Sequence, residues 1–159
     1  MLRTAIRASV LAGCVICGWG QQTSLKGLSR IRLAVVVDEG NGIGTASDKV
    51  LTKDFQISAS AVQTESELRF REAGLSIAAA DRPTYPVLVV TISAAGKLAA
   101  VVRAILLESA TLDRGSLRYV VISWNQSAVL QAPDTATIRE CVRDIESAFL
   151  NQWLADGGK

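Results

Sequence analysis

The stretch that decides the fold is 87–107, VLVVTISAAGKLAAVVRAILL, in which two apolar runs flank the short segment Ala94-Ala95-Gly96-Lys97. Both runs are rich in β-branched residues, and a small segment containing glycine is typical of the turn of a β-hairpin. We therefore expect a hairpin over 87–107 in the middle of a sheet, with helices packed on one face.

Three further segments are predicted to be strands. Residues 31–38, IRLAVVVD, are apolar nearly throughout, as in a central strand. Residues 75–80 are predicted to form a short strand, and 117–130 a long one in which alternation places Val120, Ile122 and Trp124 on one face. In the hairpin, one face is uniformly apolar, whereas the other mixes polar residues with Val87, Val89, Val101, Ile105 and Leu107.

Two helices are predicted from apolar residues spaced three and four apart. The first covers 53–73, begins at a Thr52 cap and ends before Gly74, with Arg69 on its solvent side. The second begins near 134–137, where Thr137 and Glu140 have capping-box spacing, and continues past Trp153. Its buried stripe includes Cys141, and its solvent face is predicted to hold Arg139, Arg143, Asp144 and Glu146.

These elements predict an α+β fold: a four- to five-stranded, mostly antiparallel sheet with two helices packed on one face, as a two-layer sandwich. The chain has 159 residues, of which 49% are hydrophobic and 20% charged, a composition typical of a globular domain. We expect a single domain over 21–159.

The first twenty residues are typical of a secretory signal peptide, because Arg3 and Arg7 precede about ten mostly apolar residues. Two cleavage sites are compatible with them. Leu11-Ala12-Gly13-Cys14 resembles the bacterial lipobox, in which Cys14 is lipidated, and Gly18-Trp19-Gly20 suits ordinary cleavage before Gln21. A buried N-terminal helix is the third interpretation, which Arg7 and the glycines disfavour.

Charge and composition exclude several functions. Without residues 1–20 the chain has 15 basic and 15 acidic residues, so no basic surface for nucleic acid is predicted. The chain has no histidine, which removes the commonest general base and metal ligand. The three cysteines have no disulfide or metal-binding spacing.

The glycine-rich segment 40–45, GNGIGT, is interpreted as a flexible connection, because its spacing matches neither a dinucleotide nor a Walker loop. If the protein were an enzyme, the nearby Asp38, Glu39 and Asp54 would be the candidate general bases. No spacing joins them into a carboxylate pair or metal site, so we predict no catalytic, cofactor-binding or metal-binding residues. Cys14, as a lipidation site, is the single site residue predicted.

Three short motifs carry a resemblance. They are Leu25-Lys26-Gly27-Leu28, the segment 67–75, ELRFREAGL, and Ser123-Trp124. In this order they resemble motifs of uncharacterised exported bacterial α+β proteins. The layout is also distantly similar to transporter-auxiliary and curli-secretion lipoproteins. This resemblance implies a fold and an envelope location, but no activity or site.

The sequence thus predicts an exported, non-catalytic protein of the bacterial periplasm or cell envelope that binds another protein or helps assemble a complex. Its partner would be an envelope protein or a second copy, because an apolar sheet face without helices needs a cover. Membrane contact is expected only through a lipid anchor, and no cofactor is expected. The alternative is a carrier of a small apolar ligand between sheet and helices.

Overall fold

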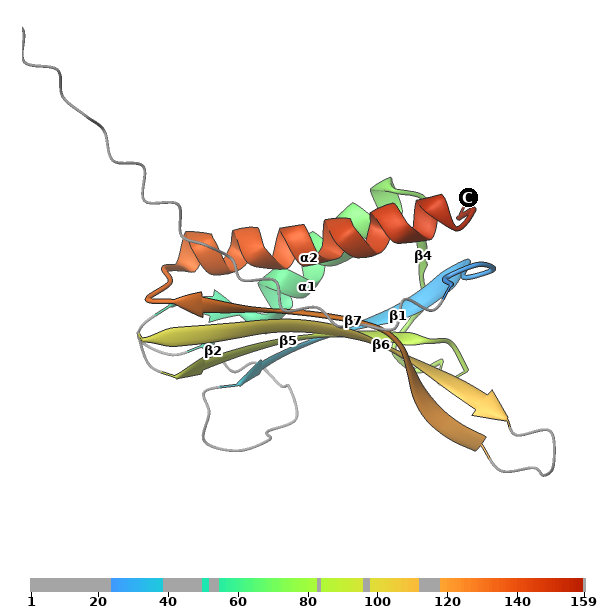
Figure 1. The fold of residues 1–159 in the computed structure, drawn as a ribbon, viewed down its shortest axis with the longest axis horizontal. Coiled ribbons are helices and arrows are strands. Elements are labelled where there is room, and N and C mark those ends of the chain that lie inside the picture. Colours follow the sequence, from blue (N-terminus) through green and yellow to red (C-terminus); the bar gives the residue numbers. More distant parts are fainter. Residues whose placement is uncertain are drawn as a thin grey trace, which may run out of the picture.

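The computed structural model of the chain describes residues 24–38, 50–51, 55–82, 84–95, 98–111 and 118–158. Within these residues the fold is α+β, with a five-stranded mixed sheet and two helices (Figure 1). The strand order is β4-β1-β5-β6-β7, so the predicted hairpin β5–β6 lies in the middle of the sheet. The strands of this sheet are β1 (Arg30–Asp38), β4 (Ser76–Ile77), β5 (Val87–Ala95), β6 (Ala99–Thr111) and β7 (Arg118–Gln131).

The prediction of a mostly antiparallel sheet is right for β5, β6 and β7 and wrong for β1. β5 pairs with β6, and β6 with β7, in antiparallel register, whereas β1 is parallel to both β4 and β5. The physical reason is the connection: between β1 and β4 the chain crosses over through α1 (Ala59–Glu72), and a crossover is what a parallel pair requires. A separate two-stranded sheet, β2 (Val50–Leu51) with β3 (Ile57–Ser58), precedes α1.

Helix α1 begins later than the sequence pattern predicts. Ser58 is its N-cap, and the Ser58 hydroxyl accepts a hydrogen bond from the Ala61 N–H at 3.5 Å. Gln56 has a φ of 48°, which no right-handed helix tolerates, so Phe55 is buried ahead of the helix and not within it. The predicted cap Thr52, together with Lys53 and Asp54, lies outside the described residues. The predicted end is confirmed, because Gly74 has a φ of 93°.

Helix α2 spans Thr135–Ala155 and is capped by a residue other than the predicted one. The Asp134 carboxylate accepts hydrogen bonds from the Thr137 N–H at 2.7 Å and from the Thr137 hydroxyl at 2.6 Å. Thr137 is therefore inside the helix, and Asp134 is the N-cap.

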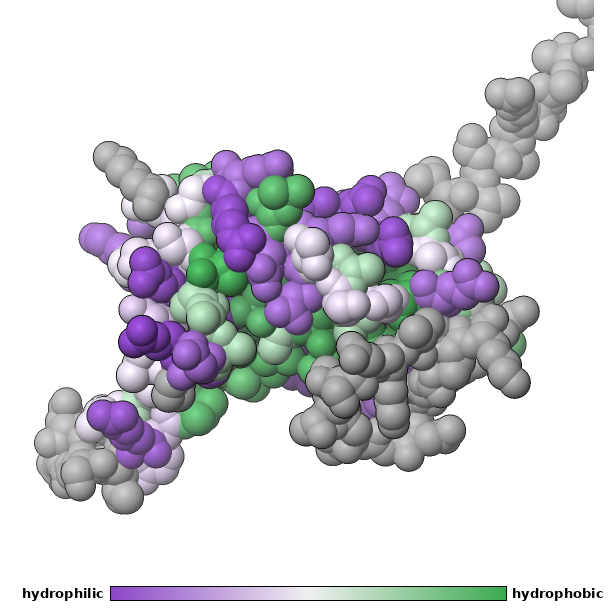
Figure 2. All heavy atoms as spheres, turned by 180° about the vertical axis from the view of Figure 1, so that it is seen from behind, coloured by the Kyte–Doolittle hydropathy of each residue, from purple (hydrophilic) through white to green (hydrophobic). Residues whose placement is uncertain are grey.

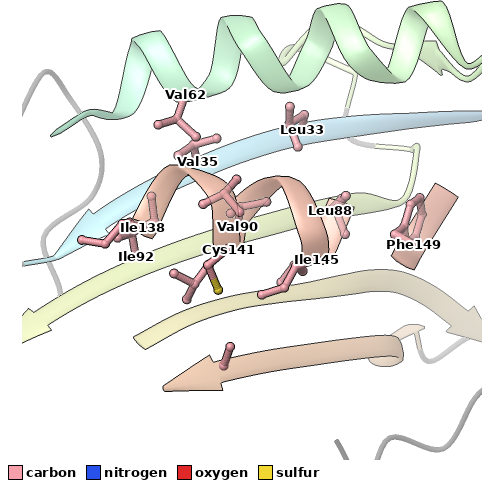
Figure 3. Packing of buried hydrophobic residues seen from close by; sticks show 14 of the residues in the cluster. Leu33, Val35, Val62, Leu88, Val90, Ile92, Ile138, Cys141, Ile145 and Phe149 are labelled. Carbon is pink, nitrogen blue, oxygen red and sulfur yellow. The ribbon is translucent and has the colours of Figure 1, made fainter. Parts of the chain in front are cut away.

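Both helices lie on the same face of the five-stranded sheet (Figure 1). Alternate residues of β1, β5 and β6 point toward them and are buried, among them Leu33, Val90 and Val102. Figure 3 shows Val90 and Ile92 of β5 beside Ile138 and Cys141 of α2, all in one core cluster. The prediction that Cys141 belongs to the core is confirmed.

Aromatic side chains fill the core between α1, α2 and β7. Phe149 makes edge-to-face contacts with Phe70 of α1 and Trp124 of β7, at ring-centroid distances of 5.9 and 5.0 Å. The Trp124 indole N–H donates to the Gln152 side-chain oxygen at 3.0 Å. Trp124 therefore anchors the core, as its sequence context predicts.

The segment before β1 is tied to the end of α2. The Leu25 N–H donates to the Asp156 carboxylate at 2.6 Å, and the Trp153 indole N–H donates to the Leu28 carbonyl at 2.6 Å. Leu25 and Trp153 are both buried. The ends of the described chain are thus joined by hydrogen bonds that satisfy buried polar groups.

Strand β7 contains a β-bulge that changes which side chains share a face. Leu106 is opposite Trp124, but Leu107 is opposite Ile122, so Ser123 is an extra residue in β7. The predicted common face of Val120, Ile122 and Trp124 is therefore wrong. Trp124 points toward the helices, whereas Val120 and Ile122 lie on the opposite face.

Candidate functional site

The face of the sheet opposite the helices, here called the outer face, carries many apolar side chains. It includes residues of β1, β5, β6 and β7 that alternate with the buried ones. Val36, Val87, Val89, Ile105 and Leu107 are partly buried there, and Val101, Val120, Ile122 and Val129 are exposed. The mixed polar and apolar character predicted for this face of the hairpin is confirmed by Thr91, Ser93 and Arg103, which lie on it.

Exposed apolar residues concentrate on β7. We call five of them the β7 strip, and their exposed fractions are 46% for Tyr119, 71% for Val120, 40% for Val121, 52% for Ile122 and 51% for Val129. Single exposed apolar residues are ordinary on protein surfaces, but four consecutive ones, residues 119–122, on one strand are typical of an interaction site.

Four of these residues, Tyr119–Ile122, lie among the first five residues of β7. Here the end of β6 and the start of β7 bend away from the helices (Figure 1). We call this part, Leu107–Thr111 with Arg118–Ile122, the arm. Val120 and Ile122 point to its outer face, and Tyr119 and Val121 to the other. The β7 half of the arm therefore carries exposed apolar side chains on both faces, so a partner that lay flat against one face would cover only half of them.

The long edge of β7 is the second feature of this site. Within the residues that the structure describes, β7 forms a ladder with β6 alone, which leaves one side of a 14-residue strand without a strand partner. Edge strands normally carry charged residues or proline that discourage pairing with other chains. The strand RYVVISWNQSAVLQ has one charged residue, Arg118, and no proline.

Hydropathy separates the two layers of the molecule. Seen from behind, hydrophilic side chains gather in the upper part, and hydrophobic ones extend through the lower middle (Figure 2). By comparison with Figure 1, the hydrophilic region lies at the level of the helices and the hydrophobic region at the level of the sheet.

A buried carboxylate between the helices was missed by the sequence pattern. Glu146 is predicted to face solvent, but it is 2% exposed. It accepts a hydrogen bond from the Ser66 hydroxyl of α1, and its other oxygen is 3.6 Å from the Arg69 guanidinium. Burial raises the pKa of Glu146, and the Ser66 hydrogen bond and the Arg69 charge oppose this rise.

Surrounding charges extend this contact into a network. Glu65 of α1 forms ion pairs with Arg139 at 3.2 Å and Arg143 at 3.9 Å, both on α2. The cavity beside Glu146 measures about 10 Å³, the size of one water molecule. The Ser66–Glu146 pair is a contact between the two helices.

A groove of about 300 Å³ lies where the segment before β1 meets Tyr85, Pro86 and Glu108. Arg30 lies over the Tyr85 ring, 5.5 Å from its centroid, and is 3.4 Å from the Tyr85 hydroxyl. The groove is lined largely by residues 24–30, of which Leu25 is buried, Leu28 is partly buried and the others are exposed.

Of the acidic residues considered from sequence, Asp38 is the one that the structure describes. Asp38 ends β1 and is partly buried. Glu39, Asp54, the glycine-rich segment 40–45 and the predicted lipidation site Cys14 lie outside the described residues, as does the predicted signal peptide. Among the described residues, no group of three or more Cys, Asp or Glu side chains is arranged to hold a metal ion.

Comparison with known proteins gives no relative: no family model matches the chain, and no curated protein matches it. Within the described part of the chain, no helix has the length and apolar character needed to span a membrane.

Proposed function

We propose that this protein is an exported, non-catalytic module of the bacterial cell envelope that binds another protein chain through the β7 strip. The observation that carries the proposal is the concentration of five exposed apolar residues on one edge strand of the described sheet. Strand edges bind partners by adding a strand, which supplies main-chain hydrogen bonds, while alternate side chains supply specificity.

The envelope location is supported by the sequence of residues 1–20, with its two basic residues and short apolar run. Export brings the protein to a compartment where assembly partners are other secreted or anchored proteins. The neutral charge of 21–159 agrees with a protein partner and not with nucleic acid.

The experiment is site-specific photo-crosslinking in a bacterial host that expresses the full chain. A photoreactive amino acid replaces Val120 or Ile122, and in the control it replaces Leu68, which is 57% exposed on the outside of α1. We expect one discrete adduct from each β7 position and none from Leu68. Equal adducts at all three positions, or none at any, would contradict binding through β7.

The export part is tested by the intact mass of the protein in membrane and soluble envelope fractions. Lipidation predicts a chain that starts at Cys14 and carries acyl mass, and ordinary cleavage predicts a soluble chain that starts at Gln21. An unprocessed chain in the cytoplasm would contradict export.

The alternative role, transport of a small apolar ligand between sheet and helices, gains no supporting observation. Among the described residues, this interior is filled by the core side chains of the strands and of α2 (Figure 3). Native mass spectrometry of the purified protein would show added ligand mass if that role were right.

A further inference from the structure

We infer that the chain bound at β7 is a second copy of this protein, and that two β7 strands pair antiparallel about a twofold axis at Asn125. The two five-stranded sheets then form one continuous sheet. This inference rests on the proposed function, because it names the partner of the same strand.

The two edges of the sheet differ in how much strand they offer a partner. At one edge β4 has two residues, and a strand this short offers little to pair with. At the other edge β7 offers 14 residues with a single charge. Arg118, at the start of the strand, would lie opposite Gln131 of the second copy, so self-pairing brings no like charges together.

The bulge in β7 determines the register in which two β7 strands can pair. When β7 pairs antiparallel with its own copy over its full length, Arg118 is opposite Gln131 and Val120 is opposite Val129. In a regular strand of 14 residues this register would place residues of opposite faces against each other. The extra residue Ser123 reverses the alternation, so Val120 and Val129 both lie on the outer face and can pair.

The centre of the strand obeys the same symmetry. If Ser123 stays unpaired in each copy, as it does in the ladder with β6, Trp124 lies opposite Gln126 of the second copy. Asn125 then lies opposite Asn125 of the second copy, on the axis. Every pair in this register joins residues of the same face, as antiparallel strands require. The strand is therefore complementary to itself over its whole length.

This register also gives the β7 side chains of the arm neighbours from the second copy on both faces. Val120 and Ile122 come to lie beside Val129 and Ser127 of the second copy on the outer face. Tyr119 and Val121 come to lie beside Leu130 and Ala128, which point toward the helices. In a dimer with twofold symmetry, each of the five residues of the β7 strip thus gains a neighbour from the other copy, and this holds for both copies.

The test begins with the molecular mass of the purified full chain in solution, measured by sedimentation equilibrium over a range of concentrations. We expect a monomer–dimer equilibrium. The axis is then tested with Asn125→Cys under mild oxidation, since the two introduced thiols lie opposite each other. Ser127→Cys is the matched control, because its two Cα atoms would be about 14 Å apart along the paired strands, beyond the roughly 7 Å that a disulfide can bridge.

The register is tested by introducing charges at Val120 and Val129, which form the same pair twice in the dimer. Val120→Glu alone and Val129→Lys alone each place an unpaired charge beside valine, and each is expected to weaken dimerisation about tenfold or more. The double variant V120E/V129K places opposite charges together and is expected to recover most of the affinity. Both positions are exposed in the monomer, so folding should be unchanged, which circular dichroism checks.

A monomer at all concentrations would overturn the inference, as would a dimer that Asn125→Cys does not crosslink. Failure of the two proposals is distinguishable by the photo-crosslinks at Val120. An adduct of twice the chain mass supports a second copy, whereas an adduct with a different protein retains the proposed function and overturns this inference.

Discussion

The Ser66 hydroxyl of α1 donates a hydrogen bond to the buried Glu146 carboxylate of α2. The two residues are 80 positions apart in the sequence, and the same hydroxyl also donates to the Val62 carbonyl at 2.8 Å. This contact fixes one helix against the other above the sheet. A carboxylate buried this far makes the stability of the protein depend on pH.

Glu146→Gln is expected to remove a pH dependence. Burial raises the pKa of Glu146 in the folded state above its ordinary value of 4.5, so the folded protein binds more protons than the unfolded chain between these two values. Stability from this group is therefore complete below pH 4.5 and declines as pH rises through the folded-state pKa. Urea unfolding from pH 4 to 8 should show this decline in the natural protein and a flatter profile in the variant. A steeper profile in the variant would show that the carboxylate is stabilised by its partners more than burial penalises it.

Ser66→Ala is expected to lower the free energy of unfolding by about 1–3 kcal/mol, because a buried carboxylate loses a hydrogen-bond donor. The loss should be largest at pH values where Glu146 is ionised. Ser147→Ala is the control, since its hydroxyl also bonds a helix carbonyl, that of Arg143 at 2.7 Å, but is exposed. We expect less than about 0.5 kcal/mol from the control. Equal effects of the two variants in urea unfolding would refute a special role for Ser66.

Phe149→Ala is expected to cost about 3–5 kcal/mol, because it leaves a cavity among fully buried side chains. Phe149 is fully buried and contacts the rings of both Phe70 and Trp124. Leu154→Ala on the same helix is the control, because Leu154 is half exposed. Thermal unfolding followed by circular dichroism measures both, and a small effect at Phe149 would mean that the helix layer is not packed as described.

Gly158→Ala is expected to destabilise the end of α2. A Cβ atom at Gly158 would lie 2.2–2.6 Å from atoms of the Trp153 ring, which is fully buried and cannot move aside. Overpacking of this kind costs about 1–3 kcal/mol, unless the terminal residues detach. Either response uncovers Trp153, so its fluorescence should shift to longer wavelength. An unchanged spectrum and melting temperature would contradict the close contact.

The local sequence determined both helices and the strands of the main sheet, but not β2 and β3. Alternation in 87–107 identified β5, β6 and the face each buries, because strand periodicity is a property of neighbouring residues. The spacing of Val62, Phe70, Ile138 and Phe149 identified both helices and their core sides in the same way. Gly74 was recognised as a helix end because a positive φ favours glycine at that position.

The tertiary structure alone decided three features. The parallel pairing of β1 depends on where the chain returns after α1, which no local pattern encodes. Glu146 is a charged residue that a helix pattern places on the solvent face. Its burial is stabilised by a hydrogen bond from Ser66, which lies on the other helix and is 80 positions away in the sequence. The bulge at Ser123 arises from pairing with β6 across a bend, and it redirects Val120 and Ile122. The candidate site depends on that bulge, so the sequence predicted an apolar face but not the exposed strand edge beside it.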